Sequence, residues 1–190
     1  MILPYKDGEV RVTSPFGWRT LNGKKENHKG VDLVGTTKTL VSPCDGTILV
    51  SRIVTDKANR TSEWGNYICI DASNGVQIYM CHMEKRLVKA GQKVKAGTPV
   101  GIEGNTGYSF GSHCHFEIRK NGVSVDPCDY LGIQNKVGQY NVRSLNAADY
   151  VDKIIEKVGF DKPADVKTAL LGVKHNCPDE LYRKIYEKMK

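Results

Sequence analysis

Residues 66–83 read NYICIDASNGVQIYMCHM and contain two short β-rich runs, 66–72 and 76–83, broken by a glycine. Runs of this length, rich in Ile, Val and Tyr, are typical of β-strands. The same pattern continues from Val10 to about Asp129 in three further runs: 46–54, 98–104 and 113–119. Regular short strands with glycine punctuation predict a mainly β fold, an antiparallel sandwich or barrel-sandwich hybrid.

The pattern changes after about residue 141, where apolar residues take helical spacing. Tyr150, Ile154 and Val158 fall on one face of a predicted helix, and two more short helices are predicted over 163–172 and 178–189. Helices this short cannot bury their apolar stripes alone. We expect a small C-terminal helical appendage that packs on the β domain or on a dimer partner, with a separate binding module as the alternative.

Composition limits the class of protein. The chain has 190 residues, with 39% hydrophobic and 26% charged residues, which predicts a folded protein. No apolar run approaches the roughly 20 residues of a transmembrane helix, and the start lacks the basic-then-apolar order of a secretory signal. We therefore expect synthesis in the cytoplasm and no membrane insertion.

Charge and cysteine usage exclude further classes. The net charge of +7 suits an anionic polymer, but no nucleic-acid-binding motif is present, so we expect no nucleic-acid partner. The six cysteines are scattered and none forms a CxxC pair, which favours free thiols over disulfides or a cysteine-built zinc site.

Two pairs of residues suggest a metal site. His113 and His115 are two apart in a strand-like run, so both side chains emerge on one face. Histidines in such a pair are equally often buried and hydrogen-bonded without a metal. His28 and Asp32 are four apart with Gly30 between them, and together they offer a nitrogen and an oxygen ligand, although such a pair on a loop is more often solvated.

A catalytic zinc usually takes three protein ligands and leaves a fourth position for water. His28, Asp32, His113 and His115, with His82 in the run YMCHM, exceed that number by two. Hydrolysis also needs a base for the proton of the attacking water and a donor for the developing oxyanion. The surplus pair therefore favours a hydrolytic site.

The order of these motifs resembles the lysostaphin-type, or LytM-type, zinc endopeptidases across residues 11–128. The matching stretches are RVTSPFGWR, HKGVDL, VSPCDGTI, YMCHM, VKAGQKVKAGTPVG and GNTGYSFGSHCHFEIR. Met83 and Cys114 stand where that family often has Leu, and both replacements are apolar. Residues 87–107 are also similar to the half-motif of lipoyl and biotinyl carrier domains, which implies a duplicated, lipoyl-like fold element.

The resemblance implies one Zn²⁺ ion held by His28, Asp32 and His115, with His82 and His113 as catalytic groups whose individual roles stay open. It implies a peptidase domain over 1–135, with residues 136–190 as the appendage or a wall-binding module. The expected substrate is bacterial peptidoglycan, through either a glycine bridge or a D-alanyl-to-diaminoacid cross-link. A phage lysin or tail-associated hydrolase is the expected setting, with a bacterial enzyme whose leader or anchor has been removed as the alternative. The alternative function is an inactive wall-binding or activator protein of the same fold.

Overall fold

The computed structural model describes residues 1–21, 23–54 and 63–141, which form a series of β-strands and one short helix. In chain order they are β1 (Glu9–Ser14), β2 (Gly17–Leu21), β3 (Lys24–His28), β4 (Val31–Val34), β5 (Thr39–Val41), β6 (Gly46–Ile53), β7 (Asn66–Asp71), β8 (Val76–Met83), β9 (Lys85–Arg86), β10 (Lys93–Val94), β11 (Pro99–Ile102), β12 (Cys114–Lys120), β13 (Val123–Val125), α1 (Pro127–Leu131) and β14 (Gly138–Asn141). The five runs read from the sequence correspond to β6, β7, β8, β11 and β12.

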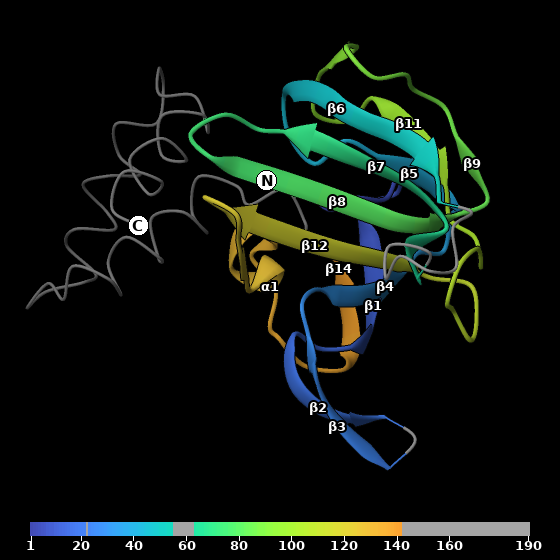
Figure 1. Cartoon of the computed structure of the whole chain (residues 1–190), viewed down its shortest axis with the longest axis vertical. Helices are drawn as coiled ribbons and strands as arrows, with labels where there is room; N and C mark the ends of the chain where they lie inside the picture. The colour runs from blue at the N-terminus through green and yellow to red at the C-terminus, as the bar shows by residue number, and fades with distance from the viewer. Residues whose placement is uncertain (22, 55–62, 142–190) are drawn as a thin grey trace, which may run out of the picture. The chain divides into compact units, whose positions relative to one another are not determined.

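One large antiparallel sheet dominates the molecule (Figure 1). Its strand order is β10-β6-β7-β8-β12-β4-β1-β14, with β13 beside β12, and its two edges do not meet. A second sheet has the order β5-β11-β9, and β2 and β3 form a hairpin that projects from the large sheet. The prediction of a mainly β, antiparallel fold is confirmed, and the described strands form no closed barrel.

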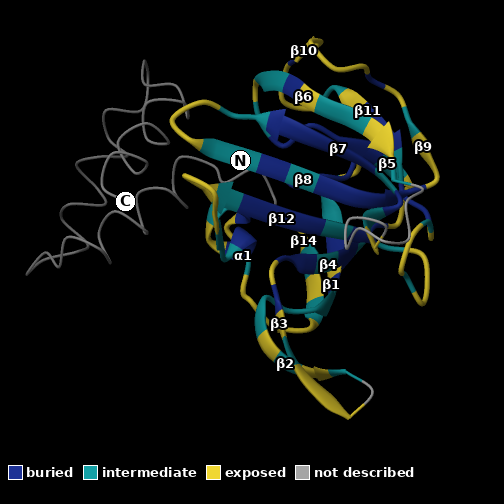
Figure 2. Ribbon diagram, viewed as in Figure 1, coloured by how far each residue is buried: buried dark blue, intermediate teal, exposed yellow. Residues whose placement is uncertain are grey.

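The core lies on one face of the large sheet. Along β12, Cys114, Phe116 and Ile118 are fully buried and belong to the apolar core cluster. The intervening residues, such as His115, point to the opposite face because side chains alternate along a strand. Figure 2 shows how far the central strands β7, β8 and β12 are buried. The functional side chains thus stand on a rigid sheet.

A β-bulge interrupts the alternation near the end of β8. Met80 and Met83 are three residues apart, yet both are buried in the core. His82 between them has a φ of 63°, in the left-handed region, and the β7–β8 register shifts opposite it. Bulges re-aim side chains next to functional sites. Here the bulge turns His82 away from the core face that strict alternation would give it.

The sequence analysis did not predict helix α1, which lies within the region expected to be all β. It has only five residues, too few for an apolar period to show. Asp126 caps it by accepting from the amide of Cys128, and Pro127 occupies its first turn. Within the part of the chain that the structure describes, no helix has the length and apolar character of a transmembrane span.

The cysteines of the described residues are free thiols, as predicted, and four of them are buried. The chain divides into two compact units, Met1–Val142 and Arg143–Lys190. Strand β14 pairs with β1 and so belongs to the first unit, beyond the expected boundary at residue 135. The predicted helical appendage, its binding role, its part in a dimer and the sixth cysteine, Cys177, fall outside the described residues.

A buried carboxylate ties several strands together. The side chain of Glu103 is completely buried, and its Oε2 accepts from the Tyr5 hydroxyl at 2.6 Å and from the Gly35 amide at 3.2 Å. Its Oε1 accepts from Ser112 Oγ at 2.6 Å and from Lys38 Nζ. Although burial alone would raise the pKa of Glu103, these hydrogen bonds lower it. The carboxylate is therefore ionised and fully paired.

Replacing Glu103 by alanine should lower the free energy of unfolding by about 3 kcal/mol at neutral pH, because its partners lose their acceptor. The depressed pKa stabilises the folded protein above the usual glutamate pKa of about 4.3 and this contribution fades as the pH falls below it. Urea unfolding at neutral and acid pH should show the gap to wild type narrowing in acid. Asp45→Asn at an exposed ion pair is the control, and an equal loss there would contradict the assignment.

Candidate metal centre

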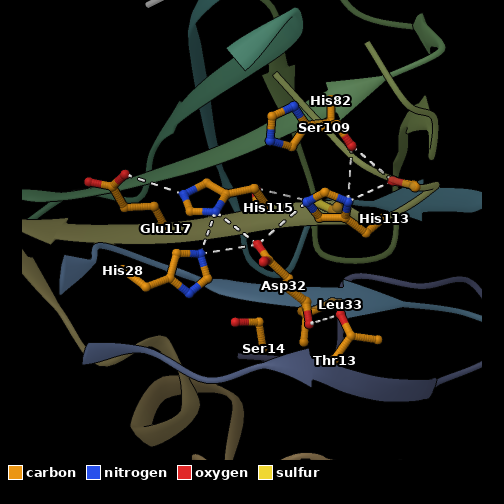
Figure 3. Close-up of polar contacts among 12 residues, drawn as sticks. Thr13, Ser14, His28, Asp32, Leu33, His82, Ser109, His113, His115 and Glu117 are labelled. Atoms are coloured by element: carbon orange, nitrogen blue, oxygen red, sulfur yellow. Dashed lines mark hydrogen bonds and ion pairs between the residues drawn. The ribbon is translucent and has the colours of Figure 1, made fainter. Parts of the chain in front are cut away.

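Three strands bring His28, Asp32 and His115 to one point (Figure 3). His28 is the last residue of β3, and Asp32 lies in β4. His115 in β12 is the direct partner of Asp32 across the β4–β12 pair, so the two side chains share a face. The sequence analysis predicted this set, and the structure brings its three members together. Their role as ligands stays a prediction.

The donor atoms have the spacing of a zinc site. Asp32 Oδ1 lies 3.1 Å from His28 Nε2 and 3.0 Å from His115 Nδ1, and the two nitrogens are 3.0 Å apart. Ligands in tetrahedral geometry around zinc, at bond lengths of 2.0–2.1 Å, lie about 3.3 Å from one another. Two imidazole nitrogens and one carboxylate oxygen are also a donor set that zinc favours. The residues therefore fit the ion.

The outer contacts orient each donor. His28 Nδ1 lies 2.8 Å from the Pro15 carbonyl oxygen, which can only accept, so Nδ1 carries the proton and Nε2 keeps its lone pair. The second oxygen of Asp32 accepts from Arg19 at 3.1 Å. His115 Nε2 faces Glu117 Oε2 at 3.6 Å, which leaves Nδ1 toward the other donors. Such partners fix ring orientation around metals.

Electrostatics prepare the site for a cation. Although burial alone would raise the pKa of Asp32, hydrogen bonds from His115 and His28 lower it far below its usual range. Burial likewise would lower the pKa of His115, but its hydrogen bonds with Asp32 and Glu117 raise it to about 9. Glu117 is itself ionised, since the bonds from His115, Arg119 and Ser124 outweigh burial and lower its pKa to about 2. At neutral pH the two carboxylates are therefore ionised and His115 carries a proton, which it must release before its Nδ1 can bind a metal.

His82 and His113 lie together beside the three donors, with ring centroids 4.8 Å apart. His82 Nδ1 donates to the Thr106 carbonyl at 2.8 Å, and His113 Nδ1 donates to the Gly111 carbonyl at 2.8 Å. With Nδ1 donating, each ring leaves Nε2 for other partners, and His113 Nε2 is 3.5 Å from Asp32 Oδ1. Burial lowers the pKa of His82 to about 4, so its ring is neutral at neutral pH.

Three aromatic residues outside the strands pack in different ways. Tyr108 and Phe110 are exposed and pack edge to face on each other, with centroids 5.0 Å apart. Trp64 instead packs on Tyr67 and Tyr79 of the large sheet. The fifth histidine, His175, predicted to be a surface residue, lies outside the described residues.

The sequence analysis missed the residues that support the site, above all Arg19, Thr106 and Glu117. Arg19 holds Asp32 from the hairpin. Thr106 anchors His82 through its carbonyl and amide groups, and its hydroxyl donates to the Met83 carbonyl. Thr106 lies in the run 101–111, whose four glycines let the backbone bend closely around the site. No local pattern indicates the contact of Arg19, which spans 13 residues.

Gly30 offers a test of how closely the backbone must approach His115. A Cβ at this position would lie 2.6 Å from the Phe116 carbonyl oxygen and 2.9 Å from His115 Nε2. We expect Gly30→Ala to displace the His115 ring and weaken metal binding by about 10- to 100-fold, as other changes around ligands do. Competition with a fluorescent zinc chelator measures this affinity. In the control Gly138→Ala the new Cβ would meet nothing closer than 3.4 Å. Equal affinities in both variants would contradict the expectation.

Residues 26–127, more than half of the chain, match the model of peptidase family M23. The chain belongs to this family. The matched range contains all five residues of the candidate site, His28, Asp32, His82, His113 and His115. Membership confirms the resemblance to the lysostaphin-type enzymes.

Curated relatives include both enzymes and an activator. The chain is 35% identical over 121 residues to the peptidoglycan DD-endopeptidase ShyC of Vibrio cholerae, a match that covers 62% of this chain and 26% of ShyC. It is 31% identical over 124 residues to the murein hydrolase activator NlpD of Escherichia coli, covering 65% of this chain and 30% of NlpD. The matches thus span under a third of either relative.

Solved structures show the same fold. The catalytic domain of lysostaphin from Staphylococcus simulans superposes with a TM-score of 0.51 at 27% identity, covering 65% of this chain and 91% of that one. A zinc-containing peptidase from Vibrio cholerae gives a TM-score of 0.54 at 28% identity, covering 67% of this chain and 37% of that one.

Proposed function

We propose that this chain is a zinc-dependent endopeptidase that hydrolyses peptide bonds in the stems or cross-bridges of bacterial peptidoglycan. The observation that carries the proposal is the convergence of the His28, Asp32 and His115 donor atoms at 3.0–3.1 Å from one another, beside His82 and His113. Relatives named as peptidoglycan endopeptidases support the substrate class.

One zinc ion would be held by His28 Nε2, Asp32 Oδ1 and His115 Nδ1. When bound, it supplies a Lewis acid that polarises a carbonyl and brings the pKa of a water ligand to about 7. In both His82 and His113, Nδ1 is bonded to a backbone carbonyl and Nε2 is left for water and substrate. One can take a proton from water while the other, once protonated, donates to the oxygen of the attacked carbonyl.

The competing function is that of a catalytically inactive activator, which the relationship to NlpD favours. An activator that no longer hydrolyses peptide bonds does not need a complete set of metal-binding groups. In this chain the three donor groups are present and oriented by outer contacts from Pro15, Arg19 and Glu117, and His82 and His113 lie beside them. That completeness supports an enzyme acting on the cell wall.

Chelation tests the proposal directly. Purified peptidoglycan incubated with the zinc-loaded protein should yield new soluble peptides, identified by mass spectrometry. Treatment with a chelator should reduce their formation more than about 100-fold, because the Lewis acid is worth several kcal/mol, and added zinc should restore it. Digestion that continues unchanged in the chelator would refute the metal requirement. A zinc-loaded protein that releases no peptide would instead indicate the activator.

A further inference from the structure

Beyond the metal centre, β12 carries two further charged residues on the same face. Glu117 and Arg119 follow His115 at intervals of two, so strand alternation places all three side chains on one side of the sheet. In Figure 3, Glu117 lies beside His115 along the strand. At about 3.4 Å per residue, Arg119 is about 14 Å along the strand from His115. An extended peptide of about four residues covers the same distance.

The guanidinium group of Arg119 is fixed in place. It lies 4.5 Å from the ring centroid of Tyr79 and 5.4 Å from that of Trp64, and its Nε donates to Glu117 Oε1 at 2.6 Å. Trp64 in turn packs on Tyr79, with centroids 5.2 Å apart. Stacking on aromatic rings and a charged hydrogen bond leave this side chain little freedom. Its position is therefore set before any ligand arrives.

Most N–H donors of the Arg119 guanidinium group remain available for a ligand. An arginine has five N–H donors, and only Nε of Arg119 donates to another described residue. The side chain is 25% exposed, so it is mostly buried but still accessible to solvent. The preferred partner of such a planar fork is a carboxylate, which accepts two parallel bonds. Glu117 takes only Nε and is already engaged by Ser124 and His115.

We propose that Arg119 is a substrate-binding residue that receives a carboxylate of the peptidoglycan stem peptide, about four residues from the bond cleaved at the metal centre. The inference rests on the proposed function for its substrate class. Stem peptides carry a carboxylate on the second-position glutamate, on a third-position diamino acid and at the C-terminus.

The test compares acidic and amidated forms of one peptide. The probe is a soluble tetrapeptide stem, and in each of three further forms one of its three carboxylates is converted to the amide. Binding to the zinc-loaded protein is measured by calorimetry, which does not require hydrolysis. Wild type should bind the acidic form about 10- to 100-fold more tightly than one of the amides, as expected for a charge-assisted bidentate pair. The amide that loses affinity identifies the carboxylate.

Arg119→Met should abolish this preference, so that the acidic and amidated peptides bind equally, whereas Arg119→Lys should retain part of it. The matched control is Lys120→Met, which removes the same charge from the neighbouring residue, whose side chain alternates to the opposite face. It should leave the preference unchanged. A purely structural role for Arg119 would lower the stability of the protein without altering the ratio of the two affinities.

The inference is overturned if wild type shows no preference, or if Arg119→Met retains it. These outcomes are distinct from failure of the proposed function. A protein that binds the acidic stem through Arg119 but never cleaves it would refute the peptidase and keep the binding site. A protein that cleaves acidic and amidated substrates equally well would refute the Arg119 binding site and keep the peptidase.

Discussion

Replacing His115 by alanine is expected to release the zinc ion and to reduce peptidoglycan hydrolysis more than about 10³-fold, the largest effect of any substitution considered for this chain. His115 offers its Nδ1 within 3.0 Å of both other donors, so its loss leaves only two protein ligands. Zinc content by elemental mass spectrometry and peptide release from peptidoglycan are the two measurements. The fold should persist, because the His115 side chain lies on the face of β12 opposite the apolar core.

His175→Ala is the control for removal of a histidine as such, since this residue matches no motif and is predicted to lie on the surface. It should retain zinc and full activity. A His115→Ala protein that keeps its zinc while losing activity would contradict the ligand assignment and give His115 a role in proton transfer instead. Loss of zinc with full activity would contradict the metal dependence of the reaction.

The strands of the central sheet could be read from the sequence because their signal is local. The runs at β7 and β8 are short, rich in β-branched and aromatic residues and broken by a glycine, so each strand can be predicted from its own residues. The pairing of His113 with His115 on one face likewise followed from the two-residue period of a strand. The ordered motifs then linked these runs to a family, which the match over residues 26–127 confirms.

Features that depend on contacts between distant residues could not be predicted from the sequence. His82 faces the site only because a bulge and a left-handed backbone conformation turn it there, whereas strict alternation would direct it into the core. The bond from Tyr5 to Glu103 spans 98 residues. Nothing in the neighbourhood of Glu103 in the sequence distinguishes it from an exposed glutamate at a strand end. Such roles follow from the tertiary arrangement and carry no local pattern.

Replacing His82 or His113 by alanine is expected to reduce turnover by about 10²- to 10⁴-fold, the usual contribution of general acid–base catalysis, while zinc stays bound. Neither Nε2 is needed as a ligand if the three donors hold the ion. Burial lowers the pKa of His82 to about 4, so its neutral, proton-accepting form persists through the neutral range and is lost only in acid. Steady-state kinetics together with zinc analysis separate this effect from metal loss.

The double variant shows whether the two histidines act as one unit. Their rings are 4.8 Å apart, and groups that share a step give effects far from additive, so the double variant should be little worse than the more damaged single variant. Ser109→Ala serves as the control for local disturbance, because Ser109 Oγ lies 3.2 Å from His113 Nδ1, which also bonds the Gly111 carbonyl. Its activity should stay within about 10-fold of wild type, since the carbonyl still orients the ring. A zinc-free His82→Ala protein would make His82 a ligand and would refute the division of the five residues into three that bind metal and two that move protons.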